Sequence, residues 1–499
     1  MIAMLILILG IIAIVTYTIE CVFSHLDDPR EPRRVSPSFP LPVIGHLLGF
    51  ARHGFDYYNY LCRNTNSEIY TVGILNFKVY ITSSPRIAQL AQKVKTLSFT
   101  PLLQVHNKIH ADMSEEATQA FCGDILASWS HSAKQALSPG PALNAQNLRM
   151  GNQALVEVTS LLKQDEIELL SWVKHAVVQA TAAGLYGMRH PLKDPTIEEA
   201  MWVWDEHRLG HMVGIDPLGT GFRARAKVWD AFQNYFQNVP GDVSLLVKER
   251  QDILLKAGIS EAEAARMQST LCDAAYPNTV PTLFWTVHEI FSRPELLEVV
   301  RHEIYSNAVQ RTGTGFVLDV AALKSNCQAL LSAYQETQRT RHYQVAFRAI
   351  TEDTVLDGHM LKKGNYLQIL SKPTHHNPNI WGPDTSSFDP YRFIPGGTKT
   401  KISPSSFQPW GVPPHMCPAR QFASTEILII TALLCCRVSL AAVSPKGWIR
   451  EPTLRSMEIA SLPRPKKNVR LRITERDDAV GTWAITMGDS KMRVPLASG

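Results

Sequence analysis

The feature that most constrains the fold is a rigid loop followed directly by a long apolar helix, in the segment FQPWGVPPHMCPARQFASTEILIITALL. Pro413 and Pro414 restrict the backbone before Cys417, and Pro418 follows it. Proline suits the first turn of a helix, because the N–H that it lacks would have no partner there. We therefore expect a helix over 418–438 with Cys417 at its N-terminus, where free N–H groups and the helix dipole favour a thiolate.

Composition narrows the class of protein. The 499 residues carry 50 basic and 45 acidic side chains spread along the chain, which leaves a net charge of +5 and no concentrated basic face. Nucleic-acid binding needs such a face, so we expect no nucleic-acid partner. None of the eight cysteines forms a C-x-x-C pair, which indicates a reduced, intracellular protein without a cysteine-based zinc site. No linker or internal repeat divides the chain, so we expect one large domain.

The first 24 residues form an apolar run in which Glu20 is the only charge. About 20 apolar residues are enough for a helix to span the hydrocarbon core of a bilayer. A cleaved signal peptide is the alternative, but no Lys or Arg precedes the run. Three arginines follow it in DDPREPRR, which favours the cytoplasmic side for the rest of the chain. We predict a transmembrane signal anchor at 1–24, a Pro-rich hinge at 25–48 and the main domain at 49–499.

Hydrophobic periodicity predicts a mainly α protein with a minor β-sheet. Residues 68–83 alternate as a two-stranded ribbon does, and 343–370 has the same strand character. Helical periodicity dominates between them, from about 84 to 340. The clearest helical stretches are 150–164, 168–185, 228–239, 261–292 and 318–340. A loop rich in Pro and Gly over 371–416 leads to the helix at 418–438.

Around Cys417 the chain resembles the haem-binding loop of the cytochrome P450 superfamily, whose usual form is Phe-x-x-Gly-x-(Arg/His)-x-Cys-x-Gly. Trp410 stands at the Phe position and His415 at the basic position. The resemblance implies that Cys417 ligates the haem iron, that His415 contacts a haem propionate and that Trp410 packs near the proximal haem face. A thiolate ligand pushes electron density towards O–O cleavage. The chain departs from the family's pattern at Pro413 and Ala419, which replace two glycines.

Glu336 and Arg339 form an E-x-x-R pair on one helix face. This spacing is expected about once by chance in a chain of this length, so its place before the predicted strands carries the argument. In the family, the pair meets an arginine from a downstream segment, and FDPYRF offers Arg392. The resemblance therefore implies that these three residues hold the cysteine loop in place, because a buried carboxylate shared by two guanidiniums locks a loop.

Further basic residues are candidates for the haem propionates. Arg348 in VAFRAI matches the family's arginine on the strand after the E-x-x-R helix. Lys134 or His131 in WSHSAK would act from an earlier helix, although the family's usual Trp-x-x-x-Arg is missing there. A surface role for Lys134 is the alternative.

A long apolar helix over 272–291 carries Pro277 and Pro281 in its interior, where prolines remove hydrogen bonds and bend a helix. In the family this helix faces the O2 side of the haem and usually offers an acid followed by Thr. This chain has Asn278 and Thr279 instead, which resembles the branch of sterol 7α-hydroxylases and prostacyclin synthase. We assign both as catalytic candidates that orient a water for proton transfer. The alternative is that they only satisfy carbonyls freed by the prolines.

The resemblance implies the cytochrome P450 fold, with haem b (iron protoporphyrin IX) between the distal helix and the cysteine loop and with 49–499 as the haem-thiolate catalytic domain. It implies a monooxygenase that uses O2 to hydroxylate or oxidatively modify a lipophilic small molecule, such as a terpenoid, steroid or polyketide. Because no flavin or nicotinamide domain is evident, electrons would come from a separate NADPH-cytochrome P450 reductase at the endoplasmic reticulum membrane. The chain is similar in general style to fungal members of secondary-metabolite pathways.

Two alternatives stay open. Loss of the distal acid favours a reductant-independent peroxide rearrangement or isomerisation of the prostacyclin synthase type, whereas Thr279 disfavours it. Pro413 in the ligand loop favours a haem-binding protein without turnover.

Overall fold

The computed structural model describes residues 2–39, 41, 44–74, 77–343, 345–394, 403–449, 452–455 and 460–498. The helices of the described chain are α1 (Ile2–His25), α2 (Gly45–His53), α3 (Tyr57–Arg63), α4 (Pro85–Ala91), α5 (Thr100–His110), α6 (Glu115–Ala120), α7 (Gly123–Ala136), α8 (Pro141–Leu161), α9 (Leu169–Tyr186), α10 (Pro195–Glu206), α11 (Arg208–Met212), α12 (Thr220–Gln237), α13 (Leu245–Lys256), α14 (Glu261–Phe291), α15 (Pro294–Asn307), α16 (Val320–Asn326), α17 (Gln328–Arg341), α18 (Ser371–His375), α19 (Pro378–Trp381) and α20 (Arg420–Arg437). The strands are β1 (Ile69–Ile74), β2 (Phe77–Thr82), β3 (Leu97–Ser98), β4 (Glu166–Glu168), β5 (Val309–Arg311), β6 (Gly315–Asp319), β7 (Val345–Ile350), β8 (Thr354–Leu356), β9 (His359–Leu361), β10 (Tyr366–Leu370), β11 (Val438–Ala442), β12 (Arg470–Glu475) and β13 (Thr482–Thr486).

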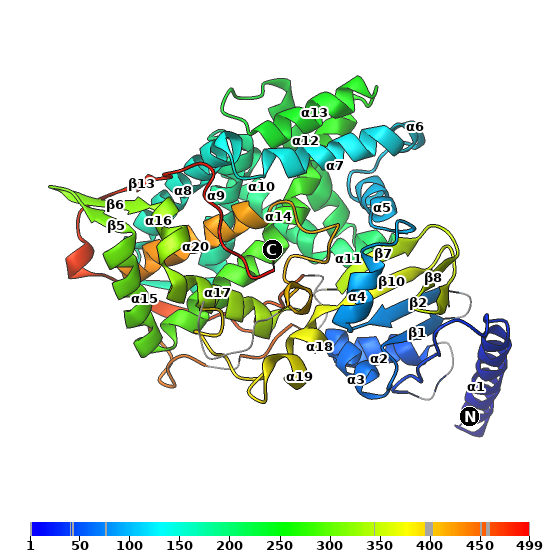
Figure 1. Ribbon diagram of the computed structural model, residues 1–499. Coiled ribbons are helices and arrows are strands. Elements are labelled where there is room, and N and C mark those ends of the chain that lie inside the picture. Colours follow the sequence, from blue (N-terminus) through cyan, green and yellow to red (C-terminus); the bar gives the residue numbers. More distant parts are fainter. Residues whose placement is uncertain are drawn as a thin grey trace.

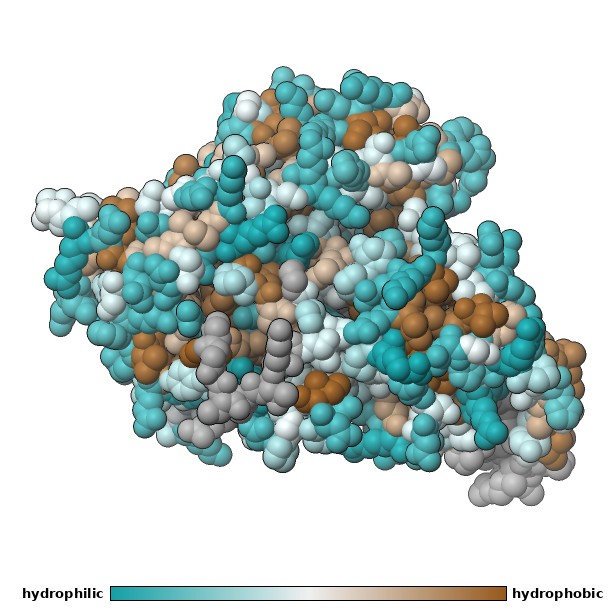
Figure 2. Space-filling view, viewed as in Figure 1, coloured by the Kyte–Doolittle hydropathy of each residue, from teal (hydrophilic) through white to brown (hydrophobic). Residues whose placement is uncertain are grey.

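Helices make up most of the molecule, and the larger sheet lies at one side of them (Figure 1). This arrangement confirms the expected mainly α class with a minor β component. On the face shown in Figure 2, apolar residues are exposed in separate patches between hydrophilic ones.

The larger sheet joins the two strand regions expected from the sequence. Its order is β1-β2-β10-β7-β3, with β1 and β2 antiparallel and in register from Ile69 opposite Thr82. Strand β10 runs parallel to β2 and antiparallel to β7. The ribbon at 68–83 and the strands within 343–370 are therefore confirmed, and Arg348 on β7 lies opposite Leu367 on β10.

Helices α14 and α20 form the centre of the helical body. Nearly every residue of α20 is buried, as expected for a helix that is apolar all round. Helix α14 packs against α9, α17 and α20 and runs unbroken through Pro277 and Pro281. Ser260 caps it by accepting the backbone N–H of Glu263 at 3.3 Å, and its Oγ donates to the Glu263 carboxylate at 2.7 Å.

A single helix over 318–340 is a wrong prediction. The structure has β6 up to Asp319, then α16, a break at Cys327, and α17. Two carboxylates define where the two helices start, one for each helix. Asp319 accepts the N–H groups of Ala321 and Ala322 at 2.9 and 3.1 Å, and Glu303 accepts those of the first turn of α17.

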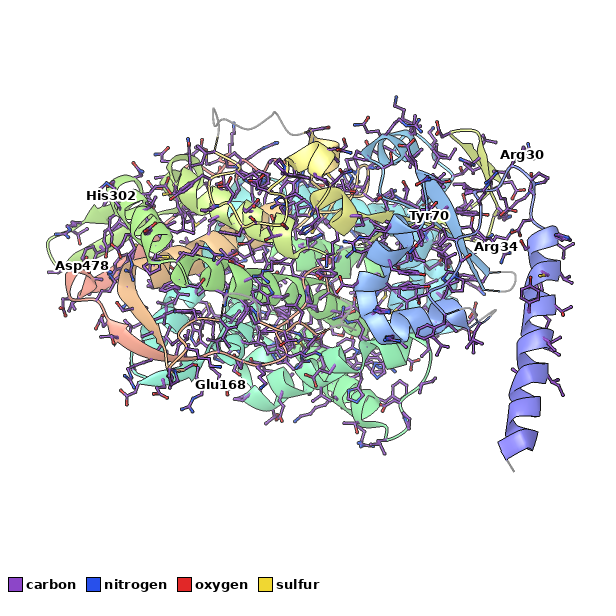
Figure 3. The ribbon with its side chains drawn as sticks, turned by 90° about the horizontal axis from the view of Figure 1, so that it is seen from below. Arg30, Arg34, Tyr70, Glu168, His302 and Asp478 are labelled. Atoms are coloured by element: carbon purple, nitrogen blue, oxygen red, sulfur yellow. The ribbon has the colours of Figure 1, made fainter. Side chains whose placement is uncertain are left out.

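The transmembrane anchor at 1–24 and the single-pass endoplasmic reticulum location are also wrong predictions. The residues do form the helix α1, which stands away from the rest of the molecule (Figures 1 and 3). Among the residues that the structure describes, however, no helix is both long and apolar enough to cross a membrane. The apolar run therefore predicted the helix correctly, whereas the membrane span that it also predicted is not found among the described residues.

The segment after α1 is fixed to the larger sheet. The N–H of Val35 donates to the Thr71 carbonyl at 2.9 Å, and the N–H of Thr71 returns a bond to Arg33. The ammonium of Lys78 lies 2.8 Å from the carboxylate of Glu31. Arg30, Arg34 and Tyr70 mark this junction beside α1 in Figure 3.

Candidate active site

The cysteine loop turns back on itself before α20. The N–H of Cys417 donates to the Trp410 carbonyl at 2.8 Å, which closes the turn. Gly411 has φ 86°, a conformation that side chains with a Cβ rarely adopt, and this explains the glycine next to Trp410. Helix α20 begins at Arg420, so Pro418 lies in the preceding turn and does not open the helix as expected.

Burial decides the acidity of the Cys417 thiol in the absence of a metal. Burial raises its pKa, whereas the backbone N–H of Ala419 and the charge of Arg420 lower it. The expected influence of the helix start is therefore present, but desolvation outweighs it. A positive metal centre would reverse this balance, because a coordinating thiol gives up its proton.

Three basic side chains converge beside the loop. The Arg348 guanidinium is buried and donates to the carbonyls of Phe347 at 2.8 Å and Val412 at 2.6 Å. Burial lowers its pKa to about 10, and no carboxylate pairs with it among the described residues. Burial, then the charges of Arg348 and Lys134, lower the pKa of His415 to about 4. The Lys134 side chain thus lies close enough to act on His415, whereas no such interaction appears for the exposed His131.

The E-x-x-R pair and the downstream arginine meet as expected. Arg339 forms two hydrogen bonds of 2.7 Å to Glu336, and Arg392 Nε donates to the same carboxylate at 3.1 Å. All three side chains are almost fully buried. The backbone N–H of Asp389 adds a fourth donor at 3.0 Å, so the shared carboxylate joins α17 to the segment around Arg392.

His375 connects this charge cluster to the cysteine loop, and sequence reasoning missed it. Its carbonyl accepts from Arg339 Nη1 at 2.8 Å, and its Nε2 accepts the backbone N–H of Gln408 at 2.9 Å. Gln408 stands two residues before Trp410, so the buried triad reaches the loop through one imidazole. A histidine in the pair His375-His376 carries no spacing signal that identifies this role.

The two distal candidates are held by different parts of the chain. Asn278 is exposed, and its Oδ1 accepts the backbone N–H of Ser461 at 2.7 Å. Thr279 is buried, and its hydroxyl donates to the Ala275 carbonyl at 2.7 Å within α14. The carbonyls freed by Pro277 and Pro281 belong to residues 273 and 277, so neither side chain satisfies a freed carbonyl.

The residues present fit a haem with a thiolate ligand. Arg348 is a buried cation without an acidic partner in the described chain, and His415 and Lys134 lie beside it, which suits the two carboxylates of a porphyrin. The indole N–H of Trp410, at the start of the loop, is buried and has no hydrogen-bond partner in the described part. Cys417 carries the one thiol of this loop, the type of group that a thiolate ligand requires.

Comparisons with known proteins agree with this arrangement. A model described as "Cytochrome P450" matches residues 219–460. The chain is 30% identical over 498 residues to the cytochrome P450 monooxygenase nodJ of Hypoxylon pulicicidum, with 95% of each chain covered. It is 26% identical to a cytochrome P450 monooxygenase of Gibberella zeae, with 83% of this chain and 82% of that one covered.

The fold is shared with a solved structure titled retinoic acid bound cyanobacterial CYP120A1. The TM-score is 0.70 at 19% identity, over 89% of this chain and 100% of that one. Fold and site together define an oxidoreductase with a haem-iron cofactor. The chain belongs to the cytochrome P450 family and is a monooxygenase.

Proposed function

We propose that this monooxygenase uses haem b, with Cys417 as the proximal ligand, to hydroxylate or otherwise oxidise a lipophilic small molecule of the terpenoid, steroid or polyketide type. Its catalytic domain would span 49–499 behind a hinge at 25–48. A separate NADPH-cytochrome P450 reductase would supply electrons, and O2 would be the oxidant. The fungal relatives support a place in secondary-metabolite biosynthesis.

The observation that carries the proposal is the buried Arg348 beside the cysteine loop, whose guanidinium pairs with no carboxylate among the described residues. A guanidinium that is 4% exposed and lacks a carboxylate is costly unless an anion completes it. Its Nη2 already donates to the carbonyl of Val412, five residues before Cys417. This contact fixes the guanidinium at one edge of the loop, where a propionate can accept its remaining N–H groups while the sulfur reaches the iron.

The bound haem would supply oxygen activation, and the protein's residues would position the reactants around it. Trp410 and the Cys417 backbone bond keep the loop closed, while the Glu336 cluster prevents the loop from moving away. On the distal side, Thr279 keeps a hydroxyl at the centre of a buried helix, where its oxygen can still accept a hydrogen bond from water. Asn278 would fix the segment around Ser461 at the edge of the substrate space.

A surface cavity of about 270 Å³ lies beside the segment that follows Ser461. Its lining is mixed, with apolar Phe55, Leu454 and Pro463 next to polar His53, Asp56 and Arg455. Pro463 also accepts the indole N–H of Trp285 at 2.8 Å, so one wall of the cavity is bonded directly to α14. We propose this cavity as the route by which an apolar molecule approaches the distal helix.

The reduced, carbon monoxide-bound absorption spectrum of the full chain tests the proposal. A strongly red-shifted Soret band is expected for the thiolate ligand, and Cys417→Ser should abolish it. Cys122→Ser is the matched control, because Cys122 is exposed and should leave the band unchanged. A red-shifted band that persists in Cys417→Ser would falsify the ligand assignment.

A reductant-independent isomerase is the second candidate. It is favoured by the missing distal acid and by the hydrogen bonds that occupy Asn278 and Thr279. The two candidates differ in their need for electrons. Product formation that requires reductase, NADPH and O2 supports the hydroxylase, whereas conversion of an organic peroxide without them supports the isomerase. A haem-loaded protein that does neither would be the binding protein that Pro413 suggests.

A further inference from the structure

Two histidines and one aspartate meet away from the cysteine loop. His106 and His110 lie one turn apart on α5, and Asp273 lies on α14. One ligand atom from each residue lies within 4.8 Å of the other two. The His106 Nε2 is 3.5 Å from Asp273 Oδ2, and the imidazole centroids are 4.5 Å apart. We propose that this cluster is a site for a divalent transition-metal ion, of which Zn²⁺ is the best match.

A buried atom without a partner supports the proposal independently of the spacing. His110 is 1% exposed, and its Nδ1 has no hydrogen-bond partner within the described chain. A buried polar atom left unpaired is costly, so a missing ligand is a direct explanation. A neutral imidazole binds a metal through a ring nitrogen, and each of these two rings can offer one.

The backbone around the cluster is held in place. Asn107, between the two histidines, accepts the Thr270 hydroxyl at 3.3 Å. Arg266 donates to the Ala111 carbonyl at 2.8 Å, and Arg225 donates to that of Ile109 at 2.9 Å. The chain is therefore fixed against its neighbours after His106 and on both sides of His110, which provides the rigid support that a metal site needs.

The nearby cations are balanced by carboxylates. Arg208 Nε lies 2.8 Å from Asp273 Oδ1, which leaves Oδ2 directed towards His106. Arg208 also pairs with Asp205, which in turn lies 3.1 Å from Arg464. The arginine thus acts as the outer partner that orients a ligating carboxylate. Arg225 and His211 are the other basic groups that influence His110.

The geometry suits an open zinc site. Two imidazoles and one carboxylate are a known zinc donor set, which leaves a fourth position for water. Tetrahedral ligands at zinc distances are roughly 3.3 Å apart, so the present atoms need to close by about 1.5 Å. The 3.5 Å between His106 Nε2 and Asp273 Oδ2 is already close to this separation. The bound ion would join α5 to α14 beside the distal residues.

Zinc binding by the full-length, haem-loaded protein tests the site. After chelator treatment and desalting, the protein should retain one added Zn²⁺, and zinc-edge X-ray absorption should show two imidazoles at about 2.0–2.1 Å. His106→Asn should weaken the affinity by more than about tenfold, whereas His302→Asn should not. His302 is the matched control, because it is exposed on α15 at the end of the molecule away from α1 (Figure 3).

A stability measurement guards against a variant that merely folds poorly. Zn²⁺ should raise the unfolding temperature of the wild-type and His302→Asn proteins, because a ligand that binds only the folded state stabilises it. The haem content of His106→Asn without zinc should equal that of the wild type, and its unfolding temperature should not respond to Zn²⁺. The absence of a retained ion in the wild type, or equal zinc affinity in His106→Asn, would overturn the proposal.

Discussion

The two sides of the candidate site are built from different kinds of contact. On the proximal side, one buried carboxylate, Glu336, accepts four hydrogen bonds from Arg339, Arg392 and the Asp389 backbone. On the distal side, Asn278 and Thr279 are each held by one hydrogen bond, to the backbone of Ser461 and to that of their own helix. The proximal side is therefore fixed by a network of charges, whereas the distal side is held by separate neutral bonds.

This difference predicts which side of the site tolerates amino-acid substitutions. Removing one member of a buried charge network leaves the other charges without partners, so the whole arrangement has to be kept together. A neutral bond at the surface can be replaced at small cost. The proximal side thus suits a common task, holding the cofactor, and the distal side suits a task that differs from one substrate to another.

The largest expected effect comes from breaking the proximal network. Arg339→Ala should cost about 3–5 kcal/mol, because it leaves the Glu336 carboxylate buried with less compensating charge. Little haem-loaded protein should be recovered, as measured by haem absorbance per polypeptide. Arg470→Ala is the control, since Arg470 and Glu166 form an exposed pair worth less than about 1 kcal/mol. Normal haem loading in Arg339→Ala would show that the network is not needed.

A second proximal carboxyl breaks the pattern of paired charges. Glu426 on α20 is fully buried and interacts with the Thr181 hydroxyl at 2.8 Å, without a basic partner among the described residues. Burial raises its pKa to about 8, and the Thr181 bond opposes the shift. The folded state therefore holds a proton that the unfolded state releases near pH 4.5, so stability falls as the pH rises from about 4.5 towards 8.

Glu426→Gln should remove this dependence. At pH 8 the variant should be more stable than the wild type by on the order of 4 kcal/mol, and near pH 4.5 the two should differ little. Denaturant unfolding at the two pH values measures the difference. Glu475→Gln, an exposed change near the end of β12, controls for a general effect of charge. A stability gap that stays the same at both pH values would contradict a neutral Glu426.

The sequence predicted the proximal network because its spacing reflects one helix face. Glu336 and Arg339 are adjacent on α17, and Arg392 meets them as the resemblance implied. The link through His375 could not be predicted, because its partners Arg339 and Gln408 lie far from it in the chain. The start of α17 was not predicted for a similar reason. The carboxylate that caps this helix belongs to Glu303, which lies on a different helix.

The distal side was harder to predict than the proximal side. The sequence predicted the helix that contains Pro277 and Pro281, but it did not predict which residues the side chains of this helix contact. The bond between Asn278 and Ser461 joins residues 183 positions apart, and the cluster of His106, His110 and Asp273 joins α5 to α14. The apolar character of the amino-terminal run also led to a wrong prediction of a membrane span. The run forms a helix, but no described helix is long and apolar enough to cross a membrane.

Arg348 is a proximal charge that lies outside the Glu336 network, since it donates only to the carbonyls of Phe347 and Val412 among the described residues. Arg348→Ala should increase the rate of haem loss by about tenfold, which corresponds to about 1.4 kcal/mol, by removing one propionate partner. Transfer of haem to an apoprotein scavenger measures the rate. Arg348→Lys keeps the charge and should lie between the two. Unchanged haem loss in Arg348→Ala would mean that this cation does not face the cofactor.

The smallest expected effect lies on the distal side. Asn278→Ala should cost less than about 1.5 kcal/mol in stability and leave haem loading intact, because it removes one neutral bond at an exposed position. It should instead loosen the segment around Ser461, so the ratio of product formed to NADPH consumed should fall by a few fold. Asn278→Asp retains an acceptor for the Ser461 N–H and should preserve more of this ratio. If Asn278→Ala lost haem as Arg339→Ala is expected to do, the two sides would not be independent, and the distinction between a fixed proximal side and an adaptable distal side would fail.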